Sequence, residues 1–393
     1  MLKPAGDERS HWLRLASIPG LGASRQRNLL AAFGLPHHIF NANRSALAAV
    51  VGRESADAIL ADPDIEAIER SLAWADEPGN QILTLADENY PQGLLDIADP
   101  PLLLYVKGRP ELLLRNGIAL VGARSATAQG MSNAEAFAHA LAGQGFSIVS
   151  GLALGIDAAA HRGALAAGPE GGGTVAVIGT GIDRIYPARN APLAREIAHT
   201  GAVVSELPLG APPLPHNFPR RNRLIAGLAQ GVLVVEAAVN SGSLITARLA
   251  TESGREVFAI PGSIHSPLSR GCHRLIRDGA KLVETAEDVI EELRGRLGLP
   301  ALHAAPAAKR DRRRAPADAG QALPRVTPDP IQHALELDDE STRLLALIGQ
   351  EAVDIDTLAA QAGLTVDALY AILLPLELEG LLARLPGGRF QRT

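Results

Sequence analysis

The stretch that decides the fold is FPRRNRLIAGLAQGVLVVEAAVNSGSLITARLATESGREVFAI, residues Phe218–Ile260. It contains a short apolar run, Gly231-Val-Leu-Val-Val-Glu236, which is typical of a strand covered on both faces. The small residues Asn240–Ser243 follow at once, and Leu244–Glu252 continues with helical spacing. A tight turn from a buried strand into a helix leaves backbone N–H groups unpaired, and such groups attract phosphate. We therefore expect a parallel α/β sheet whose strand ends bind a phosphate-bearing partner.

The same alternation of strand and helix repeats upstream and downstream of this stretch. Further strands are expected at Ile118–Val121, Ser147–Val149, Thr174–Ile178, Ala202–Ser205 and Lys281–Val283, with helical stretches between them and a closing helix at Glu287–Leu297. Strands joined through helices form right-handed βαβ units. The predicted fold class is therefore α/β, with a Rossmann-like doubly wound parallel sheet whose ligands bind at the carboxyl ends of the strands.

The rest of the chain divides into three smaller parts. Residues 1–78 predict a helical domain of the SAM or helix–hairpin–helix type, ahead of the Rossmann-like domain at 79–298. Its loop Ile18-Pro-Gly-Leu-Gly22 is either a phosphate-gripping hairpin or a plain interhelical turn. Residues 299–337 are rich in Ala, Pro and Arg and predict a linker. Residues 338–393 predict a winged helix, with helices over Ser341–Ile348, Ile355–Ala362 and Val366–Glu379 and then a hairpin.

Composition and charge exclude several classes of protein. The net charge of the 393 residues is −6, so any nucleic-acid binding must use local basic patches. The winged-helix region carries nine acidic and four basic residues, which favours a protein partner over DNA for that part. The single cysteine, Cys272, excludes an internal disulfide and suits a reducing cytoplasm. No apolar run reaches the roughly 18 residues of a membrane span, and the N-terminus lacks a signal core, so no membrane association is expected.

Two glycine-containing loops after strands are candidates for phosphate binding. Gly122-Ala-Arg-Ser125 follows a strand and opens a helix, so backbone amides and the Arg124 guanidinium can converge on one anion. Gly151 and Gly155 lie in the second loop, where a close approach of backbone to ligand requires glycine. The chain has neither the G-x-G-x-x-G dinucleotide fingerprint nor a P-loop.

The sequence contains only isolated candidates for catalytic residues. Asp157 and His161 are spaced one helical turn apart, as an acid–base pair or, more commonly, as a buried structural hydrogen bond. Glu236 ends a buried strand and is a candidate general base, but no nucleophile–base–orienter set accompanies it. The histidines show no metal-ligand spacing. We expect no catalytic residues, no metal and no cofactor.

Six motifs in one order carry a resemblance to a known family. They are Gly122-Ala-Arg124, SGLALGID at 150–157, VIGTGIDRIYPARN at 177–190, FPRRNRLIAGL at 218–228, VVEAAVNSGSLITA at 234–247 and FAIPGSI at 258–264. Together they resemble the DNA-processing protein A (DprA/Smf) family over roughly residues 80–290. The resemblance implies a Rossmann-like domain that binds single-stranded DNA, a homodimer, and loading of the RecA recombinase onto incoming DNA in natural transformation. It implies a binding protein and not an enzyme.

The resemblance also supplies site residues. The family's glycine–Ser/Thr–Arg motif falls on Gly122, Ala123 and Arg124, and Ala123 lacks the hydroxyl. The lysine that often follows the family's Tyr-Pro pair is Ala188 here, and Arg189 is the candidate substitute. The predicted nucleic-acid-binding residues are Gly122, Arg124, Ser125, Gly151, Gly155, Arg189, Arg221, Asn222, Arg223, Ser241, Gly242 and Ser243, with Phe218 and Tyr186 as candidates for base stacking.

One alternative function stays open at this point. Related Rossmann-like folds hydrolyse nucleoside monophosphates with a glycine–threonine loop near a glutamate. Glu236 and the Ser241–Ser243 loop faintly resemble that arrangement. The alternative is therefore a Rossmann-like nucleotide-processing hydrolase, which requires the Glu236 carboxylate to be free.

Overall fold

The computed structural model describes residues 8–297 and, near the C-terminus, residues 344, 348, 353–362, 364, 369, 372–373, 376, 382–385 and 389–392. The chain divides into two compact units, Met1–Ala307 and Ala308–Thr393. The predicted linker at 299–337, with its basic run Lys309–Arg314, lies outside the described residues. The boundaries at residues 78, 298 and 337 therefore stay predictions.

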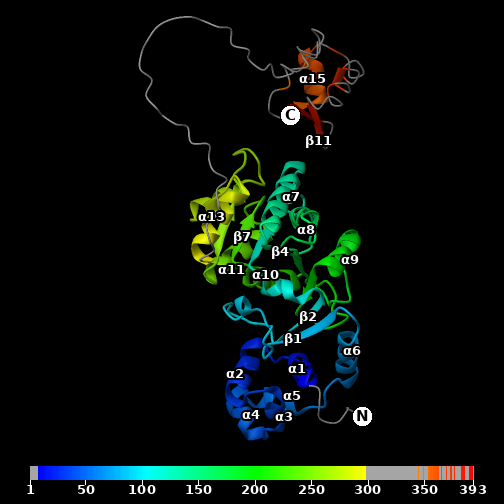
Figure 1. Ribbon diagram of the computed structural model, residues 1–393, viewed down its shortest axis with the longest axis vertical. Helices are drawn as coiled ribbons and strands as arrows, with labels where there is room; N and C mark the ends of the chain where they lie inside the picture. Colours follow the sequence, from blue (N-terminus) through cyan, green and yellow to red (C-terminus); the bar gives the residue numbers. More distant parts are fainter. Residues whose placement is uncertain are drawn as a thin grey trace, which may run out of the picture. The chain divides into compact units, whose positions relative to one another are not determined.

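The first unit is built on a nine-stranded sheet in the order β1-β2-β6-β5-β4-β3-β7-β8-β9 (Figure 1). The strands are β1 (Asn80–Thr84), β2 (Leu103–Gly108), β3 (Gly117–Val121), β4 (Ser147–Ser150), β5 (Thr174–Val177), β6 (Ala202–Ser205), β7 (Gly231–Val234), β8 (Glu256–Ala259) and β9 (Lys281–Leu282). Strands β3 to β9 pair in parallel, whereas β1 and β2 add an antiparallel edge beside β6. The predicted doubly wound sheet is confirmed.

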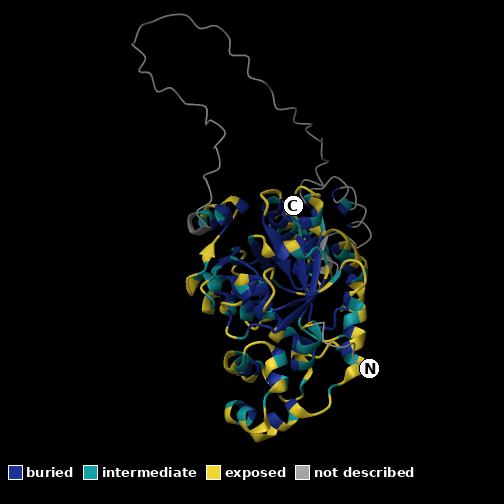
Figure 2. Cartoon of the chain, turned by 60° about the horizontal axis from the view of Figure 1, so that its bottom comes forward, coloured by how far each residue is buried: buried dark blue, intermediate teal, exposed yellow. Residues whose placement is uncertain are grey.

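Helices cover both faces of this sheet, and the strands between them are buried (Figure 2). The helices of this region are α7 (Ala128–Gly143), α8 (Ile156–Ala166), α9 (Ala191–Thr200), α10 (Asn217–Gly227), α11 (Gly242–Glu252), α12 (Arg270–Arg277) and α13 (Ala286–Leu297). Side chains alternate along each strand. Ile118 and Leu120 of β3 therefore join the core under α7, α8 and α13, whereas Ala119 and Val121 join the core under α10 and α11.

The strand order places the topological switch point between β3 and β7. From β3 the chain proceeds through β4, β5 and β6 on one side, and β7, β8 and β9 extend the sheet on the other side. The loops that leave β3 and β7 therefore diverge to opposite faces and open a crevice at the carboxyl edge. In doubly wound sheets ligands bind in such a crevice.

The N-terminal region is helical, as predicted. It consists of α1 (Glu8–Ser17), α2 (Ala23–Phe33), α3 (Pro36–Asn41), α4 (Arg44–Val51), α5 (Arg53–Leu60) and α6 (Ile65–Ala75). Their apolar side chains form one core with residues of β1, β2 and α9, including Ile82, Leu103 and Ile197. The loop Ile18–Gly22 connects α1 to α2, as the sequence predicts for an interhelical hairpin.

The second unit contains a small sheet in the order β10-β12-β11. It is built from β10 (Val353–Asp354), β11 (Leu382–Leu385) and β12 (Arg389–Arg392), and α15 (Ile355–Ala362) follows β10 directly. The predicted helix Ile355–Ala362 and the C-terminal hairpin are confirmed. The other two helices predicted for this unit lie mostly on residues outside the described part of the chain.

Candidate nucleic-acid interface

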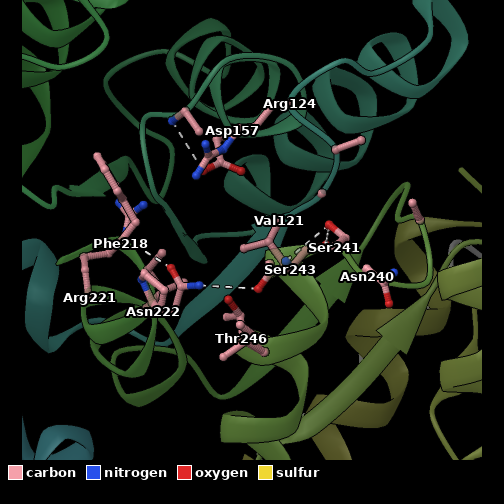
Figure 3. A pocket seen from close by; sticks show the side chains of 18 of the residues that line it. Val121, Arg124, Asp157, Phe218, Arg221, Asn222, Asn240, Ser241, Ser243 and Thr246 are labelled. Carbon is pink, nitrogen blue, oxygen red and sulfur yellow. Dashed lines mark hydrogen bonds between the residues drawn. The ribbon is translucent and has the colours of Figure 1, made fainter. Parts of the chain in front are cut away.

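A pocket of about 420 Å³ occupies the crevice at the switch point. Side chains from the loop after β3, from α10 and from the start of α11 converge on it (Figure 3). Eight of the twelve predicted binding residues line it: Gly122, Arg124, Ser125, Arg221, Asn222, Ser241, Gly242 and Ser243. The structure therefore brings together the Gly122–Ser125 loop and the Ser241–Ser243 turn, which lie more than a hundred residues apart in sequence.

The N-terminus of α11 forms one wall of the pocket. Ser241 is the N-cap residue, and its Oγ accepts a hydrogen bond from the Ser243 N–H at 3.4 Å and lies 2.7 Å from the Ser243 Oγ. The Cα of Gly242 faces open space, so nothing covers the first turn at this point. The positive end of the helix dipole and the N–H groups of the first turn make this wall suitable for an anion.

Arg124 also lines the pocket, and its charge acts on the buried Asp157. Its side chain is exposed and forms no ion pair with any residue of the described chain. The guanidinium Cζ lies 5.7 Å from the centroid of the Phe218 ring, and the Phe218 ring lies 5.5 Å from that of Tyr186 at an angle of 41°. Tyr186 is 47% exposed. An exposed cation beside the half-buried ring of Phe218 and the exposed ring of Tyr186 can contact both the phosphates and the bases of a nucleic acid.

Arg221 also lines the pocket, but its guanidinium is hydrogen-bonded to other groups of the protein. Its Nη1 donates to the carbonyl oxygen of Gly151 at 2.6 Å and to that of Val177, and its Nε donates to the Asn222 Oδ1 at 3.3 Å. Burial lowers the pKa of Arg221 to about 10, while the nearby charge of Asp157 opposes that shift. Arg221 therefore fastens α10 to the ends of β4 and β5.

Asp157 completes this buried cluster. Its Oδ2 accepts hydrogen bonds from the N–H groups of Gly151 at 3.1 Å and Ala153 at 3.4 Å. Burial raises the pKa of Asp157, and the charge of Arg221 opposes the rise. A Cβ on Gly151 would lie 2.6 Å from both the Arg221 Nη2 and the Asp157 Oδ2. Gly151 is thus required for the close approach of these protein groups, and its approach to a ligand stays a prediction.

The backbone conformation and the close packing at Gly155 also require a glycine. Its φ of +74° lies in the left-handed region, and an added Cβ would collide with the carbonyl oxygen of Ala123. Neither Gly151 nor Gly155 lines the pocket. Gly155 allows the β4 loop to pack against the β3 loop, and Gly151 allows Arg221 and Asp157 to approach the same β4 loop.

Arg223 does not lie in the pocket. Its Nη2 forms an ion pair with the Glu206 carboxylate, and its Nε lies 3.9 Å from the Asp99 Oδ2. The side chains of Arg223 and Glu206 are 10% and 5% exposed. Arg189, in the short 3₁₀ turn η3 (Ala188–Asn190), is exposed but also lies outside the pocket lining.

The groups considered for catalysis have other partners. The Glu236 carboxylate accepts hydrogen bonds from the Thr127 N–H at 3.0 Å and the Thr127 Oγ1 at 2.6 Å, so it closes the N-terminus of α7. His161 bonds through Nδ1 to the Thr174 Oγ1 at 2.7 Å, and burial lowers its pKa to about 3. The anticipated hydrogen bond between His161 and Asp157 is therefore wrong, although His161 is buried and hydrogen-bonded.

Comparison with known proteins identifies the family. Residues 81–294 match the family model described as DNA recombination-mediator protein A, and residues 327–388 match the DprA winged helix domain. The chain belongs to the DNA recombination-mediator protein A family. Protein Smf of Escherichia coli is 40% identical over 96% of this chain and 94% of its own length. The DNA processing protein DprA of Streptococcus pneumoniae is 49% identical over 53% of this chain and 73% of its own length.

Two solved structures support the same assignment. DNA processing protein A from Streptococcus pneumoniae matches with a TM-score of 0.64 and 39% identity, over 72% of this chain and 97% of that chain. DNA processing protein A from Helicobacter pylori, whose structure is described in terms of its single-stranded DNA binding mode, matches with a TM-score of 0.50 and 31% identity, over 55% of this chain and 97% of that chain. The family resemblance drawn from the six motifs is confirmed.

Thr127, which lies outside the pocket lining, is the partner of Glu236 that the sequence did not single out. A threonine just before a helix is an N-cap signal, and the Thr127 side chain does accept a hydrogen bond from the Gly130 N–H at 2.9 Å. Its partner Glu236 is 109 residues away, so no local pattern connects the two. Among the described residues, no group of His, Cys, Asp and Glu side chains is arranged to hold a metal ion, and no helix is long and apolar enough to cross a membrane.

Proposed function

We propose that this protein is a cytoplasmic, non-enzymatic mediator that binds single-stranded DNA in the switch-point pocket and loads the RecA recombinase onto it in natural transformation. One observation carries the DNA-binding part. The exposed Arg124, which forms no ion pair in the described chain, lines the same pocket of about 420 Å³ as the N-terminus of α11. A guanidinium and a helix N-terminus are both groups that bind phosphate.

The aromatic side chains support a preference for single strands. Phe218 and Tyr186 present ring faces beside Arg124, and only an unpaired base can stack on them. Stacking does not depend on base identity, and phosphate contacts carry no sequence information. We therefore expect binding with little sequence preference and with a steep dependence on salt.

The alternative of a nucleotide-processing hydrolase has less support. It requires the Glu236 carboxylate as a general base, but both hydrogen bonds of that carboxylate are made to Thr127. The pocket lining instead offers hydrogen-bond donors and the Phe218 ring, with the Asp157 carboxylate engaged by backbone N–H groups, which suits the binding of a strand without a reaction on it.

The recombinase and homodimer parts of the proposal rest on family membership. The family is that of a recombination mediator, which implies a protein that assists a recombinase. RecA assembly on a fluorescent single strand should accelerate when this protein is added, and the Arg124→Ala variant should not accelerate it. The mass in solution, from light scattering, should be that of two chains.

Arg124→Ala is the direct test of the DNA site. A charge-assisted hydrogen bond contributes about 1.5–3 kcal/mol, so the variant should bind a single strand about tenfold to a hundredfold more weakly. Arg53→Ala is the matched control, because Arg53 is also an exposed arginine without an ion pair in the described chain but lies in α5, at the N-terminal helices. Fluorescence anisotropy with single- and double-stranded oligonucleotides at two salt concentrations provides the measurement.

The Arg124→Ala and Arg53→Ala variants should differ clearly in their affinity for a single strand. Loss of affinity in Arg124→Ala with normal affinity in Arg53→Ala supports the proposed pocket. Equal affinity of Arg124→Ala and the unmodified protein, with melting temperatures unchanged, would show that the strand binds elsewhere.

A further inference from the structure

We propose that the single strand leaves the switch-point pocket over Tyr186 and inserts one unpaired base into a second, smaller cavity beside α9. This inference rests on the proposed function, because it extends the path of the same strand. It assigns a base-binding subsite to residues of β2, α9 and the loop after β5, none of which belongs to the predicted set of binding residues.

The cavity has the size and polarity that a base requires. It has a volume of about 150 Å³ and lies between α9, the end of β5 and the outer strands β6 and β2. Its walls are apolar and include Ile178, Ile182, Ile185, Ala194 and Val203. An apolar protein cavity of about 150 Å³ accommodates a benzene-sized ring. The planar face of one nucleobase therefore fits, whereas a base pair does not.

Two free cations flank the cavity. Lys107 of β2 and Arg195 of α9 both line it, are exposed and form no ion pair within the described chain. Asp183 also lines it, but its Oδ1 accepts a hydrogen bond from the Gly210 N–H at 2.8 Å and so is partly engaged. Two cations and one acidic group give the mouth a net positive charge, which matches the phosphates on either side of an inserted base.

One loop of the chain leads from the first pocket to the cavity. Ile182 and Ile185 form part of its wall, and Tyr186, whose ring contacts Phe218 in the first pocket, is the next residue along the chain. Arg184 and Arg189 of the same loop are exposed and make no ion pair with a described residue. A strand that stacks on Phe218 and Tyr186 therefore meets unpaired cations in the direction of the cavity.

The opposite direction is less favourable for a phosphate backbone. A groove of about 640 Å³ along α11 shares Asn240, Ser241 and Ile245 with the first pocket. Each arginine that lines this groove already has a carboxylate partner: Arg248 with Glu252 at 3.5 Å, Arg255 with Asp96 at 2.9 Å and Arg274 with Asp278 at 3.6 Å. Paired arginines contribute little net attraction, so the free charges select the path toward α9.

The test compares short and long oligonucleotides in three variants. Lys107→Gln and Arg195→Gln remove the flanking charges, and Ala198→Leu fills the cavity from the half-buried face of α9. Arg53→Gln is the matched control for a lost surface charge. Affinities are measured by anisotropy for thymidine oligonucleotides from a length that spans only the first pocket up to several times that length, at two or more salt concentrations.

The subsite predicts a loss that appears only with long strands. Lys107→Gln and Arg195→Gln should each lower the slope of log affinity against log salt by about 0.7, as expected for one lost phosphate contact on a single strand. Ala198→Leu should weaken long-strand binding about fivefold, the scale of one base contact. In the unmodified protein, one position of an abasic-site scan should show the same loss, and Ala198→Leu should abolish that position's effect.

The outcomes separate this inference from the proposed function. Short-strand binding that depends on Arg124, together with unchanged long-strand binding in all three variants, would overturn the subsite and leave the proposed function intact. An equal loss for short and long strands would also overturn it, since the charges would then act on the first pocket. Absence of any single-strand binding by the unmodified protein would refute the proposed function itself. The result for Ala198→Leu is used only if its melting temperature equals that of the unmodified protein. If it does not, the affinities of Lys107→Gln and Arg195→Gln decide whether the subsite exists.

Discussion

Replacement of Arg223 by alanine should destabilise the protein strongly while leaving the switch-point pocket in place. The sequence groups Arg223 with Arg221 and Asn222 as DNA contacts, but in the structure its guanidinium is paired with Glu206 inside the protein. Its removal leaves the Glu206 carboxylate 5% exposed without its main partner. Unfolding, and not weakened binding, is therefore the first expected consequence.

The size of the effect follows from the burial of the pair. Removal of one partner of a buried ion pair costs about 3–5 kcal/mol, because the remaining charge is left uncompensated. One kcal/mol shifts the melting temperature of a domain of this size class by about 2–4 °C. The melting temperature of the Arg223→Ala variant should therefore fall by roughly 6–20 °C at pH 8.

The effect should also depend on pH, with a definite sign. Burial raises the pKa of Glu206, and the charges of Arg223 and Arg220 oppose that rise. Without Arg223 the pKa rises further, so the folded variant takes up a proton more readily than the unfolded chain. The stability contributed by this proton is present at low pH and is lost as the pH rises through the folded-state pKa. Differential scanning fluorimetry should therefore show a smaller difference from the unmodified protein at pH 5 than at pH 8.

Arg220 provides a matched control on the same carboxylate. It lies 3.3 Å from the Glu206 Oε1 but is 53% exposed, so Arg220→Ala should cost only about 0–1 kcal/mol. Adding Glu206→Gln to Arg223→Ala should restore part of the stability, since no charge then remains buried. A normal melting temperature for Arg223→Ala combined with lost single-strand affinity would refute this reasoning and return Arg223 to the DNA contacts.

Two further predictions concern groups near the pocket. Glu236→Gln should lower the melting temperature by a few degrees, because a charge-assisted cap of α7 worth about 1.5–3 kcal/mol is weakened. Neither this variant nor the unmodified protein should hydrolyse any of a panel of nucleoside monophosphates. Nucleotide turnover by the unmodified protein that is lost in the variant would contradict this. Gly151→Ala should weaken single-strand binding through displacement of Arg221 and Asp157, and a variant that binds and melts normally would show that the β4 loop relaxes without cost.

The fold could be predicted from the sequence because each central strand is a short apolar run. The predicted strands at Ile118–Val121 and Ala202–Ser205 match β3 and β6 within one residue at each end. Helix α12 (RGCHRLIR) was not predicted, although its core-facing residues Cys272, Leu275 and Ile276 have helical spacing. The helix is only eight residues long, which is shorter than the stretch over which apolar periodicity can be recognised.

The candidate site could be predicted only in part. Arg124 and the Ser241–Ser243 turn come together because the carboxyl ends of parallel strands share one edge of a sheet. The hydrogen-bond and ion-pair partners of Arg221 and Arg223 could not be predicted in this way. Successive residues of a helix point about 100° apart, so a basic run on α10 spreads over several directions. Arg221 bonds to the carbonyl oxygen of Gly151, which is remote in sequence. Arg223 pairs with Glu206, which lies in an irregular loop.

The distribution of charge explains how a chain with a net charge of −6 can attract a polyanion. Arg221 lies beside Asp157 and Arg223 beside Glu206, so both buried arginines are neutralised within the protein and add little to the field outside. The positive potential at the pocket therefore depends on Arg124 and the end of α11, with Arg184 and Arg189 nearby. Because so few free charges produce it, each should have a large separate effect on binding, whereas the buried arginines should affect binding only through the stability of the loops that they hold.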